Sequence, residues 1–315
     1  MIRRMSAVIA ALALSAPALD AQEKITLQQK YVPGKYELKQ VMTSQAETTI
    51  RGQMVPTDMS MTMVMEIVVQ APDDKGLTKV QMGFRQVKQK VSQSGKAMME
   101  YDSENPGIGD QSEALGRMYK PLLAAKIAFQ VSKEGKIQNF SGLEEIWDNM
   151  AKEDPNLAEV AEEMKKQINN SMVEKMMSQA SKSFPDKPVG VGDTWKVETK
   201  MTVPMVGEMV VNQDCKLKDV EKSGSTRLAV VEIEAKAKAD KPVENKTRRG
   251  TMTVEKMQTA QKGTMKVDVD KGIAVQQNWD GTVDMEMTTV GRDGESTPIS
   301  SKQKLKMEIT MTVKP

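Results

Sequence analysis

The stretch that decides the fold is residues 141–184, SGLEEIWDNMAKEDPNLAEVAEEMKKQINNSMVEKMMSQASKSF, the one long helical pattern between two β-patterned arms. Asp154-Pro155 predicts the start of its main helix, because Asp is a favourable N-cap and proline loses no hydrogen bond at the first helical position. Ser141 and Glu144 have capping-box spacing and predict a shorter helix before it. The main helix carries one apolar stripe with helical spacing, formed by Leu157, Ala161, Met164, Ile168, Met172, Met176 and Ala180.

The arms on either side of this stretch have the alternation of half-buried β-strands. Apolar and polar residues take turns from Leu305 to Val313, from Met59 to Met65 and from Val283 to Met287. Strands with one polar and one apolar face indicate an antiparallel sheet that faces water on one side. In residues 79–91 the apolar positions change phase after Phe84, which predicts a β-bulge or a bend.

Short matches between the two arms recur in the same order. The best of them pairs residues 138–142, QNFSG, with residues 277–281, QNWDG, and each follows a glycine turn. Such matches predict an internal duplication, and the alternative is one irregular sheet with recurring hairpins.

The predicted fold is mainly β (α+β). We expect curved antiparallel sheets or half-barrels, with the long central helical segment packed on the apolar face, because each apolar surface can bury the other. The predicted parts are a signal peptide (1–21), a first β arm (22–140), the central helical segment (141–184) and a second β arm (185–315).

The start of the chain has the features of a secretory signal peptide. Arg3 and Arg4 precede a short apolar core from Ser6 to Leu14, and a small-residue cleavage pattern ends at Ala18 or at Ala21. The alternative, a retained membrane anchor, needs roughly 20 apolar residues, and this run is shorter. We therefore expect an exported protein, periplasmic or extracellular, without a transmembrane segment in the mature chain.

Several chemistries are disfavoured by what the sequence lacks. It contains no histidine, the usual general base near neutral pH, and Cys215 is its single cysteine. Catalytic sites built on histidine, and metal sites built on histidine or paired cysteines, are therefore excluded. The net charge of +2, with both signs interspersed, gives no reason to expect nucleic acid as a partner. We predict no enzymatic activity, no metal and no cofactor.

Methionine is the most unusual feature of the composition, with 27 residues against 3% aromatic residues. Three interpretations are open: Met replacing Leu in an ordinary core, an adaptable lining for a lipid or other apolar ligand, or a Cu(I) site of thioether sulfurs. The candidate ligand-binding residues lie on predicted strands and on the helix: Met61, Met63, Met65, Met164, Ile168, Met172, Met285, Met287 and Met307.

A resemblance rests on residues 184–195, FPDKPVGVGDTW, which follow the helical segment and precede a run of alternating strands. With the signal peptide, this motif resembles exported bacterial proteins from a family of unknown function, seen in Gram-negative and related bacteria. The expected architecture is also distantly similar to the periplasmic half-barrels that carry lipoproteins and lipids. Neither resemblance assigns a role to a residue.

Two functions fit these observations. The first is an exported binding protein that holds an apolar small molecule or lipid on a Met-lined concave face, with the helix as a lid. The alternative is a structural or interaction protein of the cell envelope, with another envelope protein as its partner and the same face serving as core. An enzyme would have to work with carboxylates, Lys or Tyr alone.

Overall fold

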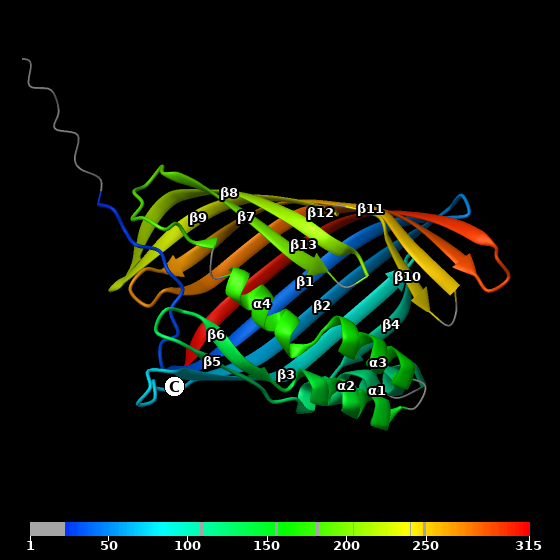
Figure 1. Cartoon of the computed structure of the whole chain (residues 1–315), viewed down its shortest axis with the longest axis horizontal. Coiled ribbons are helices and arrows are strands. Elements are labelled where there is room, and N and C mark those ends of the chain that lie inside the picture. The colour runs from blue at the N-terminus through cyan, green and yellow to red at the C-terminus, as the bar shows by residue number, and fades with distance from the viewer. Residues whose placement is uncertain are drawn as a thin grey trace, which may run out of the picture.

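The computed structural model describes residues 23–107, 110–154, 157–180, 183–203, 205–239, 241–247 and 250–315. The predicted signal peptide lies outside them. Thirteen strands form one curved, open antiparallel sheet (Figure 1), so the fold is mainly β. The strands are β1 (Gly34–Ile50), β2 (Gln53–Val69), β3 (Thr78–Gln93), β4 (Lys96–Asp102), β5 (Ile127–Val131), β6 (Ile137–Ser141), β7 (Thr194–Val203), β8 (Gly207–Ser223), β9 (Thr226–Ala239), β10 (Val243–Thr247), β11 (Gly250–Asp268), β12 (Ile273–Gly291) and β13 (Ser296–Lys314).

The strand order joins both predicted arms into a single sheet. It runs β6-β5-β3-β2-β1-β13-β12-β11-β9-β8-β7, with β4 paired to β3 and β10 paired to β11. In the middle, β1 and β13 pair antiparallel over their length, from Lys35 opposite Lys314 to Ile50 opposite Ile299. The early and late parts of the chain therefore share one hydrogen-bonded seam.

Local sequence explains how the strands turn and bend. Arg51 and Gly52 both have positive φ, 50° and 80°, which is the backbone of a two-residue hairpin loop whose twist matches its strands. On β3, Gln86 pairs with Val64 and Phe84 pairs with Met65, so Arg85 is an extra residue. This register shift confirms the bulge that the phase change predicted.

The two arms also pair their strands in the same order. β1, β2, β3, β5 and β6 are successive neighbours in the first arm, and β7, β8, β9, β11 and β12 are successive neighbours in the second. The short strands differ, since β4 pairs with β3 but β10 pairs with β11. The internal duplication stays a prediction.

The described part of the chain has four helices, α1 (Asp110–Ala124), α2 (Leu143–Glu153), α3 (Ala158–Gln167) and α4 (Asn170–Ala180). The continuous main helix expected from Asp154 to Ala180 is wrong, because the chain leaves helical geometry at Ile168. The Asn169 side chain accepts the backbone N–H of Met172 at 3.0 Å and so caps α4. The indole of Trp147 donates to the carbonyl oxygen of Ile168 at 3.1 Å, which satisfies a group freed by the break.

The predicted helix starts also differ from the structure. Gly142, in the left-handed conformation, precedes α2 without a side-chain cap, and the Ser141 hydroxyl donates to the carbonyl of Ala128 instead. Asp154 ends α2 as its C-cap and pairs with Arg117 of α1. Pro155 lies outside the described residues.

Three apolar clusters hold the fold together. The first packs β5, β6 and α2 on the starts of β1 and β3 and the end of β2. The second packs residues near the chain start on β8, β9 and β11, and the third packs α1 on β3 and β4. Their buried members include Tyr36, Val80, Phe129, Ile137 and Ile146 in the first cluster, Leu27, Cys215, Leu217, Val231 and Val267 in the second, and Val87, Tyr101, Leu115 and Tyr119 in the third.

Candidate functional site

The sheet has two faces, and we call one of them the inner face. It is defined by one row of residues that are paired across neighbouring strands. Every second side chain along each strand, counted from that row, belongs to the same face. Directly paired residues of an antiparallel sheet point to the same side, so the row identifies one face. It crosses eight strands from β2 to β7 through Met61, Met42, Met307, Trp279, Gly263, Ile233, Cys215 and Trp195. All three clusters lie on this face.

The inner face carries no charge over most of its area. Every inner position of β1, β2, β7, β12 and β13 has an uncharged side chain. The same holds on β8 from Met209 to Leu217, on β9 from Ala229 to Ala239 and on β11 from Met257 to Val267. The opposite, outer face has the lysines and carboxylates, most of them exposed. One side of the sheet is therefore built for water and the other for apolar contact.

The clusters cover the inner face only at its two sides. Between them, on β11, β12 and β13, most inner residues are half-buried and belong to none of the three clusters of the described residues, although Val254 is buried. This uncovered band, as we call it below, consists of Met257, Val283, Met285, Met287, Leu305 and Met307.

The structure leaves all nine predicted ligand-binding residues half-buried. Met61 and Met63 pack on the third cluster, and Ile168 packs on the first. The inner face brings together Met61 and Met307, which flank Met42 in the row, and also holds Met65, Met285 and Met287. Met164 and Met172 lie apart from it in sequence, on α3 and α4.

The floor of the inner face includes a tryptophan that lies on a glycine. Gly263 and Trp279 are paired across β11 and β12, and a methyl group added to Gly263 would lie 2.6 Å from the indole atom Cε3. The absence of a side chain at Gly263 therefore lets the indole lie flat on the sheet, beside Met307.

A few polar groups interrupt the apolar surface. The Gln40 amide donates to the sulfur of Met307 at 3.3 Å, and Tyr119 donates to the Gln89 amide oxygen at 2.6 Å. The side-chain oxygen of Gln213 is buried without a hydrogen-bond partner among the described residues. These neutral groups can hydrogen-bond a ligand, and they supply no counter-ion.

Cys215 belongs to the inner row, and its thiol is unreactive. It is 3% exposed, and burial, with the nearby carboxylate of Asp214, raises the pKa of its thiol to about 11. A thiol that stays protonated at neutral pH is neither a nucleophile nor a metal ligand. Across the described residues, no three His, Cys, Asp or Glu side chains are grouped so that they could hold a metal ion.

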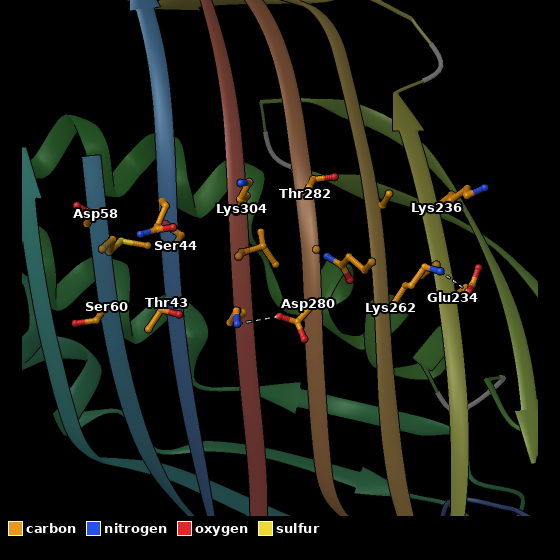
Figure 2. A pocket seen from close by; sticks show the side chains of 18 of the residues that line it. Thr43, Ser44, Asp58, Ser60, Glu234, Lys236, Lys262, Asp280, Thr282 and Lys304 are labelled. Carbon is orange, nitrogen blue, oxygen red and sulfur yellow. Dashed lines mark hydrogen bonds and ion pairs between the residues drawn. The ribbon is translucent and has the colours of Figure 1, made fainter. Parts of the chain in front are cut away.

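The sequence analysis missed a groove on the outer face, with a volume of about 830 Å³ (Figure 2). Figure 2 shows one row of side chains with Thr43, Asp280 and Glu234, and a second row with Asp58, Lys304 and Lys236. Asp280 pairs with Lys306 at 3.6 Å and Glu234 pairs with Lys262 at 2.8 Å. Two lysines of the groove are therefore paired with carboxylates of neighbouring strands. The alternating Lys and Glu positions of the strands were its signal in the sequence.

The motif at residues 184–195 has a structural part in the fold. The indole of Trp195 donates to the Ser183 carbonyl at 3.0 Å, and Asp193 accepts the Gly190 N–H at 2.9 Å. Val189 exchanges two backbone hydrogen bonds of 2.9 Å with Ile25. The motif thus ties the residues before β1 to the start of β7 and borders a cavity of about 1220 Å³ at that end of the sheet.

Comparison with known proteins gives one family. The model of a family of unknown function (DUF6263) matches residues 75–274, which include this motif. No curated protein matches the chain. Within the part of the chain that the structure describes, no helix is long and apolar enough to cross a membrane.

Solved structures show only distant likeness. A structure entitled "Lipid-protein interactions in lipovitellin" is 12% identical with a TM-score of 0.42, over 91% of this chain and 26% of that chain. The present chain thus spans about a quarter of the lipovitellin chain. Pseudomonas aeruginosa OpdQ is 6% identical with a TM-score of 0.23, over 89% of this chain and 100% of its own. At this level of likeness, neither ligand nor activity transfers between proteins.

Proposed function

Since this chain belongs to the DUF6263 family of unknown function, we propose a function from its own inner face: it is an exported, non-catalytic protein that binds an apolar ligand there. The observation that carries the proposal is the uncovered band. Six apolar side chains lie half-buried between the clusters without joining any of them. Apolar surface that the protein's own clusters do not cover is typical of a binding site.

The residue types of the band suit a ligand of irregular shape. Met257, Met285, Met287 and Met307 have unbranched, polarisable side chains that can repack around different apolar partners. The flat indole of Trp279 borders them and offers a rigid surface. An acyl chain or a similar hydrocarbon is therefore the ligand part that fits.

The absence of charge on the inner face limits what that ligand can be. A carboxylate or ammonium placed on this surface would lose its hydration and find no opposite charge among the inner positions named above. The bound part of the ligand must therefore be neutral, and any charged head group must stay at the rim in water. Helix α4, which packs on β6, is the candidate lid.

Export and the lack of catalysis rest on the sequence. Arg3 and Arg4 with the apolar core behind them support secretion, and the absence of histidine removes the usual general base. We accordingly assign no catalytic residue, metal or cofactor.

One observation favours the second function, a structural or interaction protein of the cell envelope. Met61 and Met63 already pack against the third cluster, so part of the Met-rich face is filled by the protein's own side chains. In that case the uncovered band would contact another envelope protein.

A ligand-binding test uses two substitutions on β12 that each add one positive charge. Met285→Lys places the charge in the uncovered band, and Thr282→Lys places it on the exposed outer face of the same strand. We expect the first variant to lose affinity for the neutral fluorescent probe N-phenyl-1-naphthylamine by more than tenfold and the second to bind like the unchanged protein. Equal binding by all three proteins would contradict the proposal.

The natural ligand can be sought by mass. The mature protein, purified from the exporting cell, is weighed under native and then denaturing conditions. An extra mass that is lost on denaturation and is missing from Met285→Lys supports the carrier function. A native mass equal to that of the polypeptide, together with a failure to bind the probe, supports the envelope-interaction function.

A further inference from the structure

The two end strands of the sheet, β6 and β7, have different surroundings. At one end, helix α4 packs on β6. At the other end, β7 pairs with β8 on one side, and none of the described strands pairs with its other side. Figure 1 shows β7 at the margin of the arch. An edge of ten residues that no described strand pairs with is a template for another strand.

The side chains of β7 restrict which strand can pair there. Its outer positions are exposed and alternate in charge through Lys196, Glu198 and Lys200, whereas its inner positions are half-buried and uncharged. A partner must therefore present the same division of faces and the opposite order of charge. A second copy of β7, running antiparallel, meets both requirements.

Symmetry leaves few possible registers. Two identical strands related by a two-fold axis pair antiparallel about one central residue, and that residue pairs with itself. Centring on Glu198 puts two Glu198 side chains together and sets Lys196 against Lys200, and centring on Lys200 joins two lysines. Like charges directly opposite one another are unfavourable.

Centring on Thr199 avoids these conflicts and pairs the strand from Trp195 to Val203, all of β7 except Thr194. Glu198 then lies opposite Lys200 of the second copy, and Lys200 lies opposite Glu198 of the second copy. Val197 lies opposite Met201 on the inner side. Centring on Val197 or on Met201 pairs a shorter stretch. We propose that two copies of this chain join through their β7 edges in the register centred on Thr199, so that their inner faces form one continuous surface.

The register is tested with single cysteines. At the two-fold axis the two Thr199 residues are direct neighbours, at a distance that a disulfide can bridge. We expect Thr199→Cys to give a disulfide-linked dimer under mild oxidation, and neither Glu198→Cys nor Lys200→Cys to do so. The native Cys215 is buried, so the unchanged protein is a control without crosslinks. A crosslink at Glu198→Cys or Lys200→Cys, or none at Thr199→Cys, would overturn the register.

The charge pairs are tested by exchange. Glu198→Lys alone, or Lys200→Glu alone, should weaken dimerisation roughly tenfold, because two attractive pairs become two repulsive ones. The double variant restores both pairs with reversed sign and should dimerise like the unchanged protein. The measurement is molar mass by light scattering over a dilution series. An unchanged protein that is monomeric throughout, or a dimer insensitive to both exchanges, would refute the proposal, and neither outcome depends on a ligand.

Discussion

The indole of Trp279 lies on the backbone of Gly263, its cross-strand neighbour, so that an added methyl group would approach the ring to 2.6 Å and the carbonyl oxygen of Asn278 more closely still. Because the Asn278 oxygen belongs to the backbone, it cannot move away as a flexible side chain could. The glycine is therefore required by its neighbours and not by its own backbone conformation.

We expect Gly263→Ala to lower the free energy of unfolding by about 1–3 kcal/mol, the usual cost of overpacking. The measurement is a urea titration followed by tryptophan fluorescence, which should also shift because the indole is displaced. Gly83→Ala is the matched control, since Gly83 is likewise in a strand but its added methyl group would meet only the Ala125 carbonyl oxygen, at 3.7 Å. Equal stability of the two variants would show that the indole does not rest on Gly263.

Because of Cys215, the free energy of unfolding should decrease as the pH rises above 9. Its thiol pKa is about 11 in the folded protein and near 9.0 in the unfolded chain, so the unfolded state loses this proton first as pH rises. The contribution of Cys215 to the free energy of unfolding is therefore constant below pH 9 and falls by up to about 2 kcal/mol between pH 9 and 11. The free energy of unfolding should fall less over this pH range in Cys215→Ala than in the unchanged protein. An equal fall in both proteins would disprove the prediction. At pH 8, a thiol reagent should label Cys215 only after unfolding.

Gln213 should be replaceable by a residue of similar size. Its side-chain oxygen is buried without a hydrogen-bond partner among the described residues. The free energy lost when this oxygen leaves water is therefore not offset by a hydrogen bond. We expect Gln213→Leu to raise the free energy of unfolding by about 1 kcal/mol. Asn212→Leu, on the exposed outer face of the same strand, should change it little. Destabilisation by Gln213→Leu would mean that this oxygen has a partner in solution.

Asn169 should hold the start of α4. Its side chain accepts the Met172 N–H, and removal of an N-cap of this kind costs about 1 kcal/mol. Asn169→Ala should therefore speed hydrogen exchange at the first amides of α4, and Ser171→Ala, at an exposed neighbouring position, should not. Slower exchange in Asn169→Ala would indicate that alanine fuses α3 and α4 into one helix.

The strands could be predicted from the sequence because their signal is local. Alternation identified β2, β12 and β13, and the phase change after Phe84 identified the bulge at Arg85. The same alternation contained the uncharged inner face, since a period of two assigns every residue to a side. The pairing of β1 with β13 has no local signal, because it depends on which strand edges remain free once the hairpins have formed.

The helices show why apolar periodicity was insufficient. The stripe through Ile168 and Met172 has the right spacing, but Asn169 competes for backbone hydrogen bonds and starts a second helix. In α4, Val173 and Met177 pack on the first cluster, and Met176 is exposed. Helix α1 runs through Gly116 and Pro121, two residues that disfavour helix, and the burial of Leu115 and Tyr119 in the third cluster supports it. Such tertiary support is invisible in a local pattern.

The seam between β1 and β13 also sets the order of events during synthesis. Residues 34–50 emerge from the ribosome well before residues 296–314, so one side of β1 has no partner while most of the chain is made. Closing that seam brings together segments very distant along the chain, which is slow and leaves apolar strand surface exposed in the meantime. Under the export that we propose, delayed closure has a use, because a polypeptide that cannot complete its sheet early remains loose enough to be threaded through a translocation channel.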